Sequence, residues 1–380
     1  MNKLFLIGNG FDLAHDLKTR YTDFIVWYLS KVFSKSESTT THPFQYEDGL
    51  MWMRHSSYNN VPIIKFTSIQ HFKDEMNNYK IDYEFKPTFF KTLINSAHEY
   101  NWVDIESHYY DALTKLYLKI NEKGDSIKQS IIDNDLKPLN SCLDLIKNEL
   151  IEYLQTVEIN KYDKDIGQHF QNELFKFRQE NNYLPDHEVG EIHVLNFNYT
   201  STIENYINNN LTMLDPYIDG YSNSKKVNWN INYIHGSLKD IENNPIIFGY
   251  GDESDSYYEK IELLKSNEFL DHIKAFRYMK VGNYRNLLKF IELPNKFDVF
   301  IMGHSCGLSD RLLLNSIFES EKCNSIKIFY HQKGQDKNEN DFFPKTQEIS
   351  RHFITEKNKV RMRALMVPEN ECDALTSFKK

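Results

Sequence analysis

The first twelve residues constrain the fold more than any other stretch of the chain. Residues 4–7 form a continuous apolar run, and Gly8 and Gly10 follow it on either side of Asn9. Such a run, followed by helical periodicity, predicts a strand that is buried on both faces. Glycines in the following turn would let a ligand approach the backbone, and the amides of the next helix would suit a phosphate. An ordinary strand-to-helix turn explains the same residues equally well.

Composition narrows the class of protein and its partners. The chain has 380 residues, 40% of them hydrophobic, which suffices for one large core or for a core with a sizeable insertion. Its formal net charge of −9 disfavours nucleic acid as a partner, although a local basic groove stays open. No segment resembles a signal peptide or approaches ~18 consecutive apolar residues, so we expect a cytoplasmic protein without a membrane span.

The four cysteines give no sign of a metal or disulfide framework. They are widely separated and form no C-x-x-C pair: Cys142, Cys306, Cys323 and Cys372. A structural zinc site is therefore not expected, and a reducing compartment fits best.

The pattern of apolar residues divides the chain into two kinds of segment. Apolar residues recur at three- and four-residue spacing from about 85 to 180, which predicts helices. Short apolar runs then predict strands at 192–197, 231–235, 246–248, 297–302 and 326–330, with a further candidate at 363–367. Helical segments at 201–208, 254–278 and 309–318 separate several of these strands.

Strands that alternate with helices predict an α/β fold with a doubly wound, mainly parallel, Rossmann-like sheet. The first strand needs a sheet that only the second half of the chain can supply. We therefore predict an α/β core from residues 1–33 and 188–370, and a large, mainly helical insertion from residues 34–187 after the first strand. Residues 371–380 are predicted to be a loose tail.

Four polar clusters follow predicted strands, where an open parallel sheet forms its ligand crevice. The first cluster supplies candidate nucleotide-binding residues, which are Gly8, Asn9, Gly10, Phe11 and Asp12. Leu13 stands where G-x-G-x-x-G requires a third glycine, and no convincing ribose-binding acid follows ~20 residues later. An ordinary dinucleotide-binding dehydrogenase is therefore disfavoured.

The second and third clusters supply the candidate catalytic residues. Asn196 and Asn198 end one strand, and an asparagine there can orient a sugar hydroxyl or a water. A turn asparagine, with Thr200 as helix cap, is the structural alternative. His235 ends another strand before Gly236 and could present its imidazole as a general base, although a lone histidine is more often an ordinary core or surface residue.

The fourth cluster supplies Gly303, His304, Ser305 and Asp310, which form a tight turn before a helix. Residues 303–307 also fit the G-x-S-x-G nucleophile elbow, so a hydrolase is an alternative. That motif needs an acid and then a histidine, for which the candidates are Glu319 or Glu321 and then His331 or His352. No second glycine-rich oxyanion loop is evident.

One further pair lies in the predicted insertion. Trp102 and Glu106 are four residues apart, which puts them on one helix face. We interpret Glu106 as a solvated or capping acid rather than as a catalytic one.

The order and spacing of these motifs resemble the bacterial abortive-infection AbiH family nearly end to end. The resemblance rests on residues 6–12, 102–106, 196–200, 234–238 and 303–305 together with Asp310. It implies a role in defence against bacteriophage.

The same motif order is more distantly similar to sirtuin-like domains that hydrolyse NAD in antiphage systems. That likeness implies a sirtuin-like sheet in which Gly8 and Gly10 cradle phosphate, Asn198 lies at the nicotinamide ribose and His235 is the base. Two departures matter, because Thr200 replaces the acid that often follows the Asn-Tyr pair, and the four-cysteine zinc module of protein-deacylating sirtuins is missing from the sequence. The missing zinc module argues against deacylation and leaves NAD cleavage possible.

We therefore expect an antiphage effector that hydrolyses NAD and releases nicotinamide, with NAD as substrate and no resident cofactor. Asn198 would orient ribose or water, and His235 would be the general base. A nucleotide-binding sensor without turnover and a nuclease or tRNA-targeting toxin are the alternatives. The resemblance leaves open a phage-derived trigger and assembly into a homo-oligomer.

Overall fold

The opening apolar run forms β1 (Asn2–Ile7), the central strand of a five-stranded sheet. The computed structural model describes residues 1–37, 44–55, 64–100, 103–159, 161–181, 190–207, 229–336 and 339–376. The sheet has the order β6-β5-β1-β7-β8, and every pair of neighbours is parallel. The other four strands are β5 (Ile192–Asn196), β6 (Trp229–Tyr233), β7 (Phe297–Met302) and β8 (Cys323–Phe329). The predicted parallel sheet and four of its later strands are confirmed.

Helices cover both faces of this sheet, as the alternation along β1 requires. Leu4 and Leu6 belong to one apolar cluster, which includes side chains of α12 (Asn283–Ile291), α13 (Arg311–Phe318), α14 (Phe342–Ser350) and α15 (Glu356–Leu365). Phe5 and Ile7 belong to another, with side chains of α1 (Asn9–Ala14) and α8 (Lys164–Asn181). Full burial of each such side chain contributes about 1.5–3 kcal/mol to stability.

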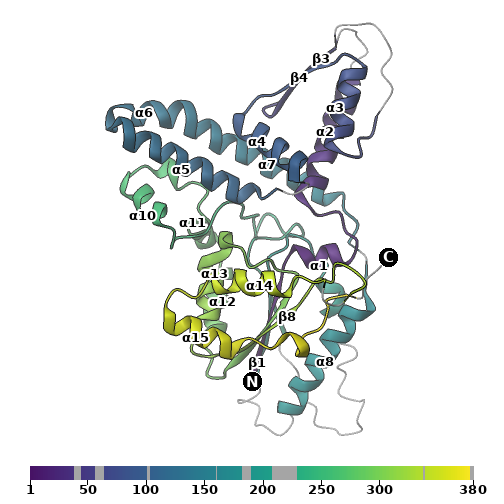
Figure 1. Cartoon of the computed structure of the whole chain (residues 1–380), viewed down its shortest axis with the longest axis vertical. Coiled ribbons are helices and arrows are strands. Elements are labelled where there is room, and N and C mark those ends of the chain that lie inside the picture. Colours follow the sequence, from purple (N-terminus) through teal and green to yellow (C-terminus); the bar gives the residue numbers. More distant parts are fainter. Residues whose placement is uncertain are drawn as a thin grey trace.

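The upper part of Figure 1 is mainly helical. Its helices are α2 (Tyr21–Glu37), α3 (Ile69–Asn78), α4 (Thr88–Tyr100), α5 (Ile105–Lys123), η1 (Asp125–Ile127), α6 (Lys128–Ile131), η2 (Ile132–Leu136) and α7 (Lys137–Gln155). It also contains a small antiparallel sheet of β2 (Phe44–Glu47), β3 (Met51–His55) and β4 (Asp82–Phe85). These short strands were not predicted, because their polar surroundings are typical of a loop.

Three predicted elements differ in the structure. Residues 246–248 are irregular, and the backbone N–H of Ile247 donates to the carbonyl of His235 at 2.8 Å. Residues 363–365 continue α15, and only Met366 forms an isolated bridge to β8. The predicted helix 254–278 is broken into α10 (Ser256–Leu263), η5 (Asn267–Phe269), α11 (Lys274–Arg277) and η6 (Tyr278–Lys280). In each case the run of apolar residues indicates that the segment is buried, but it does not determine whether the backbone is strand, helix or irregular.

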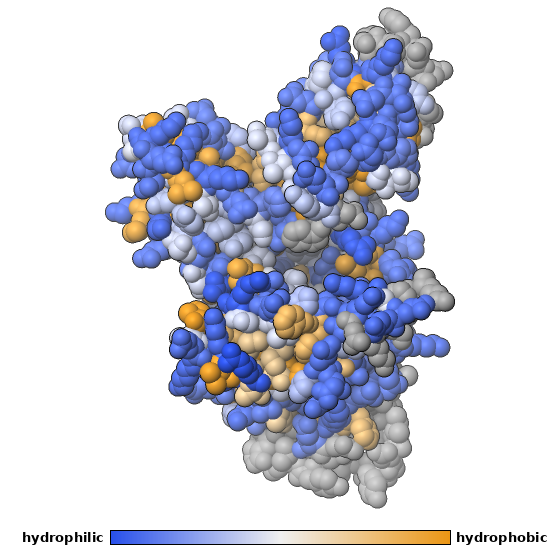
Figure 2. Space-filling model, in the orientation of Figure 1, coloured by the Kyte–Doolittle hydropathy of each residue, from blue (hydrophilic) through white to orange (hydrophobic). Residues whose placement is uncertain are grey.

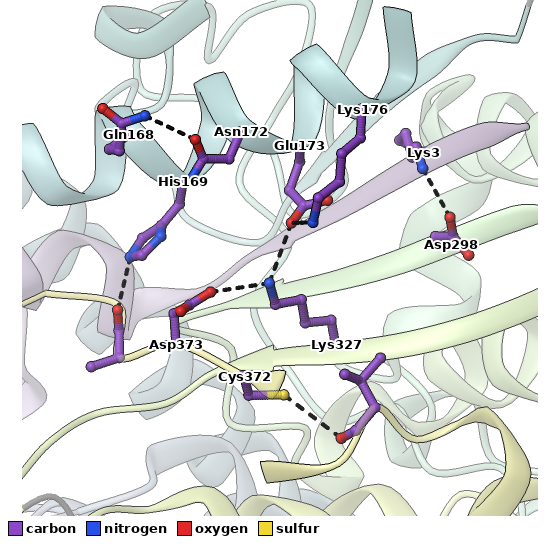
Figure 3. Close-up of polar contacts among 12 residues, drawn as sticks. Lys3, Gln168, His169, Asn172, Glu173, Lys176, Asp298, Lys327, Cys372 and Asp373 are labelled. Carbon is purple, nitrogen blue, oxygen red and sulfur yellow. Dashed lines mark hydrogen bonds and ion pairs between the residues drawn. The ribbon is translucent and has the colours of Figure 1, made fainter. Parts of the chain in front are cut away.

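Packing also departs from the predicted domain boundaries. Helix α8 lies within the range predicted for the insertion but packs on the sheet, and α2 lies within the predicted core but packs with α7. Two ion pairs link α8 to the sheet, from Glu173 to Lys327 at 3.3 Å and from Glu180 to Lys3 at 3.3 Å. Figure 3 shows Lys327 between Glu173 of α8 and Asp373.

Part of the segment predicted as a loose tail packs against the core. The backbone N–H of Leu375 donates to the carbonyl of Tyr330 at 2.8 Å, and the Leu375 side chain is buried. His169 of α8 contacts the carbonyl of Ala374 at 2.8 Å. The remaining described elements are η7 (Leu308–Asp310) and η8 (Glu369–Glu371).

The face seen in Figure 2 is mostly hydrophilic, with hydrophobic residues scattered over it. Among the described helices, none combines the length and the apolar character that crossing a bilayer requires.

Candidate functional site

A cavity of about 420 Å³ lies at the carboxyl ends of the strands, between the sheet and the helical insertion. Its floor comes from the turns after β1, β5, β6 and β7, which carry all four predicted clusters. Its other wall comes from the start of α2 and from α5 and α7 of the insertion, through Tyr21, Glu106, Leu150 and Leu154. The site is therefore built from segments that are far apart in the sequence.

The glycines of two turns allow the backbones to pack against each other. The N–H of Gly10 donates to the carbonyl of Gly303 at 2.8 Å. A Cβ atom on Gly303, whose φ is +74°, would lie 2.0 Å from the backbone nitrogen of Phe11. A Cβ on Gly8 would lie 2.5 Å from the Cα of His304. These glycines are therefore required for contact between the turns after β1 and β7.

This packing changes the expected phosphate cradle. The N–H of Gly10 is engaged by Gly303, and the N–H of Phe11 donates to the carbonyl of Gly8 at 2.8 Å. Both amides are therefore already satisfied within the protein. The side chain of Asn9 is also engaged within the protein. Its Nδ2 donates to the carbonyl of Thr19, and its Oδ1 accepts a hydrogen bond from the Thr19 hydroxyl.

The two asparagines after β5 have different roles in the structure. The amide of Asn196 braces the turn, because its Nδ2 donates to the carbonyl of Thr200 and its Oδ1 accepts from the N–H of Asn198. Asn198 lines the cavity, and its Nδ2 donates to the carbonyl of Gly8 at 3.0 Å. Its Oδ1 makes no hydrogen bond with the part of the chain that the structure describes. The side chain of Asn198 is thus held in one orientation, and its Oδ1 is left as an unused hydrogen-bond acceptor.

Asp12 is a buried carboxylate that lines the cavity and is only partly satisfied. Its Oδ2 accepts a hydrogen bond of 2.6 Å from the hydroxyl of Thr200, whereas its Oδ1 has no partner among the described residues. Burial raises the pKa of Asp12 from 3.8 to about 6, although hydrogen bonds from Thr200 and its neighbours oppose this shift. A buried acid with an unused oxygen is a feature typical of functional sites.

His235 lines the cavity from the end of β6 and is 5% exposed. Its Nε2 lies 3.1 Å from Oδ1 of Asp310 and 3.1 Å from the hydroxyl of Tyr278. Because an ionised carboxylate only accepts hydrogen bonds, Nε2 carries the proton and Nδ1 holds the lone pair. Nδ1 has no hydrogen bond among the described residues. Burial and the charge of Lys274 lower the pKa of His235, against the opposing effect of Asp310, so the ring is neutral at physiological pH.

His304 contacts the same carboxylate from the turn after β7. Its Nδ1 accepts the N–H of Cys306 at 2.9 Å, so its Nε2 faces Oδ2 of Asp310 at 3.5 Å as the protonated nitrogen. Asp310 is therefore approached by one histidine at each oxygen. Although burial would raise the pKa of Asp310, Lys274 and His235 hold it well below its ordinary value.

Lys274 is the cation of this cluster, and it is fully buried. Its Nζ lies 2.8 Å from Oε2 of Glu106 and 2.9 Å from Oδ1 of Asp310. The other oxygen of Glu106 accepts the N–H of Gly249 at 3.0 Å. The interpretation of Glu106 as a solvated or capping acid is wrong, because Glu106 is buried and Asp104 caps α5. Trp102 lies outside the described residues.

Two basic residues at the cavity were not predicted. Arg20 is exposed and has no ion pair within the described ranges. Lys345 of α14 donates to the carbonyl of His304 at 3.1 Å and is paired with Asp341 at 3.4 Å. Nothing in their local sequence marks these residues, because each lies outside any strand-end motif.

The nucleophile-elbow alternative lacks its hydrogen-bond chain. Ser305 lines the cavity and is exposed, but no histidine among the described residues is bonded to its hydroxyl. His352 instead contacts the carbonyl of Cys306 at 2.8 Å, and Glu319 accepts the N–H of Ile354.

Ten of the twelve candidate residues line the cavity. The exceptions are Asn196, which braces its turn, and Phe11, which packs in the apolar cluster beneath α1. Among the residues that the sequence did not single out, Arg20, Tyr21 and Lys345 line the cavity, and Lys274 contacts Glu106 and Asp310 of its wall.

The fold and the site define an α/β protein with a polar cavity at the carboxyl edge of a parallel sheet, closed by a helical insertion. The sequence model of the bacteriophage abortive infection AbiH family matches residues 4–332, which include all four clusters. The chain therefore belongs to this family, and its role lies in abortive infection. No curated protein matches it.

Proposed function

We propose that the cavity binds NAD and hydrolyses its N-glycosidic bond, and that the loss of NAD stops phage propagation. The observation that carries this proposal is the convergence of Asn198 and His235 on one cavity, each with an unused acceptor atom. Both residues match the distant likeness to sirtuin-like NAD-hydrolysing domains.

The strand order supports a nucleotide ligand. Numbered along the chain, the five strands of the parallel sheet are ordered 3-2-1-4-5, as in doubly wound nucleotide-binding domains. In such sheets ligands bind where the strand order reverses, which here is between β1 and β7. The cavity lies at this point and has a volume typical of small-molecule sites.

The cavity also offers groups for the other parts of the substrate. Arg20 and Lys345 supply positive charge for a diphosphate, in place of the backbone amides that the glycine turns use internally. Asn198 offers its unused Oδ1 to a ribose hydroxyl. These groups fit a polyanion that carries sugar hydroxyls.

The reaction needs one activated water and no strong acid. The C1′–N bond breaks with its electron pair moving to nicotinamide, which leaves as a neutral base, and the ribose becomes oxocarbenium-like. Asn198 Oδ1 orients the ribose or the water. The water oxygen bonds C1′ while Nδ1 of His235 takes its proton, a role that typically contributes ~10² to 10⁴-fold.

Nicotinamide release by the purified protein tests this proposal. We expect His235→Ala and Asn198→Ala each to lower the rate ~10²-fold or more, because each removes a group that acts on the reacting atoms. The matched controls are the exposed residues His331→Ala and Asn172→Ala, which should retain activity. Because a trigger could be required, NAD is also measured in phage-infected cells. Protection from phage with NAD unchanged would exclude the proposal.

A nucleotide sensor is the second candidate, because the insertion supplies part of the cavity wall. A bound nucleotide would then contact Glu106, Leu150 and Leu154 and could alter how the insertion meets a phage component. Saturable nucleotide binding by calorimetry, with no nicotinamide released and with protection intact in His235→Ala, would favour this candidate.

A further inference from the structure

We infer that Lys274 is a positioning residue that keeps the imidazole of His235 neutral, and that Glu106 of the insertion holds Lys274 in place. Four buried side chains are in contact one after another. Nζ of Lys274 lies 2.8 Å from Oε2 of Glu106 and 2.9 Å from Oδ1 of Asp310. The same oxygen of Asp310 lies 3.1 Å from Nε2 of His235. This inference rests on the proposed role of His235 as base.

Asp310 alone would have two opposed effects on the base. Its carboxylate accepts a hydrogen bond from Nε2–H and so orients the ring. The lone pair of Nδ1 is then left to act as the base. The same negative charge favours a second proton on the ring, and an imidazolium has no lone pair with which to take a proton from water.

Lys274 resolves this conflict because it approaches the same oxygen of Asp310 as His235 does. Its positive charge offsets the carboxylate and repels a proton from the ring, while the hydrogen bond that orients His235 stays intact. Asp310 can therefore position the base without charging it.

Glu106 makes a buried lysine tolerable at this position. Lys274 is 0% exposed, and an ammonium group in such surroundings requires compensation. Glu106 belongs to α5 and is itself held by the N–H of Gly249. The charge balance of the base is therefore complete only when the insertion is seated on the sheet.

The other titratable groups near His235 do not provide this balance. Among the described residues they are Tyr278 on its Nε2 side, and His304, whose Nε2 faces Asp310. Tyr278 is neutral at physiological pH, since burial raises the pKa of its hydroxyl well above the ordinary value. Lys274 is thus the cation whose removal should change the proton affinity of His235.

The experiment is an NMR titration of the histidine rings in ¹⁵N-histidine-labelled full-length protein, with the His235 signals assigned by His235→Gln. The test variant is Lys274→Met/Glu106→Gln, which removes both charges, retains the side-chain lengths and leaves Asp310 free to pair with a charged ring. We expect its His235 pKa to rise by about one unit or more. The acid limb of nicotinamide release should move upward by the same amount.

Two further variants make the result specific. Glu106→Gln alone keeps the pair between Lys274 and Asp310. Burial raises the pKa of Glu106 from 4.5 to about 7, so its carboxyl is largely protonated where His235 titrates, and this variant should leave the His235 pKa nearly unchanged. Lys31→Met/Glu149→Gln is the matched control, since it removes a similar ion pair between α2 and α7. It should leave the titration of His235 unchanged.

The outcomes separate this inference from the proposed function. An unchanged His235 titration in Lys274→Met/Glu106→Gln would overturn the inference, whatever the enzymatic activity. An upward shift in that variant, with little change in Glu106→Gln, would support the inference even if no variant, nor the wild type, released nicotinamide. Hydrolysis is judged separately, from the NAD content of phage-infected cells.

Discussion

At the scale of single residues, Asp12 shows how the site reduces stability. Its carboxyl group is 1% exposed, and one oxygen lacks a partner within the described ranges. Ionising such a group in the folded protein is unfavourable, and a neutral side chain of the same shape would avoid this cost. The protein thus retains a destabilising charge where a ligand could use it.

Asp12→Asn is therefore expected to stabilise the protein. The folded state binds the Asp12 proton more tightly than the unfolded chain does, so stability falls as pH rises from 3.8 to about 6. The gain from the substitution should reach up to about 3 kcal/mol at neutral pH and disappear below pH 3.8. Urea unfolding at neutral and acidic pH measures it.

A matched control for this prediction is Asp82→Asn. Asp82 is exposed on β4, so its substitution should leave the free energy of unfolding unchanged at either pH. A loss of stability in Asp12→Asn at neutral pH would show that its carboxylate is compensated in the folded state.

The sequence predicted the residue types of the site better than their roles. Asn198, His235 and Asp310 could be singled out because each follows a strand, and the carboxyl ends of parallel strands meet at one edge. Lys274 could not be predicted, since its partners come from α5 and from the turn after β7. Ion pairs between distant segments leave no local pattern.

At the scale of elements, the two glycine turns determine how closely the ends of β1 and β7 approach. The sequence suggested that their glycines admit a ligand. In the structure these glycines instead let the two turns pack against each other, because the backbone of one turn occupies the space where a side chain of the other would lie. Motif spacing alone cannot distinguish these two uses of a missing Cβ.

Three glycine substitutions separate the effects of strain and contact. Gly303→Ala combines a φ of +74° with a Cβ 2.0 Å from the nitrogen of Phe11, whereas Gly124→Ala combines a φ of +84° with open space. The backbone strain costs about 1–3 kcal/mol in both, and the close contact should add roughly 1–3 kcal/mol in Gly303→Ala alone. Gly282→Ala, with neither feature, should be nearly neutral.

Denaturant unfolding of these three variants tests the assignment. Equal losses of stability in Gly303→Ala and Gly124→Ala would contradict the assignment, because they would mean that the turns separate without cost and that Gly303 is needed only for its backbone conformation.

At the scale of the whole molecule, the insertion and the second half of the chain share one apolar cluster. Phe248, Tyr250, Ile261 and Phe269 pack with side chains of α2, α4, α5 and α7. The rings of Tyr110 and Tyr250 stack with centroids 3.9 Å apart. The sequence predicted a strand at 246–248 and a helix at 254–278 but not that the insertion would cover them, because apolar periodicity identifies a buried face without naming its partner.

Removing the insertion should therefore not release a folded core. A chain in which a short Gly/Ser linker replaces residues 21–159 exposes Phe248, Tyr250, Ile261 and Phe269 together, and we expect it to aggregate. Size-exclusion chromatography measures the outcome. The same deletion with Ile261→Ser and Phe269→Lys should recover some soluble protein. A soluble, cooperatively unfolding chain without these substitutions would contradict the shared cluster.

The central position of β1 also has a consequence for biosynthesis. Lys3 of β1 forms its ion pair with Asp298 across 295 residues, so during synthesis the pairing of β1 is completed only by β7, nearly 300 residues later. At ordinary rates of synthesis this delay is ~15–60 s. Asp310 and Lys345 emerge later still. A nascent or truncated chain that ends before β7 therefore cannot assemble the cavity, because the turn after β7, Asp310 and Lys345 all line it.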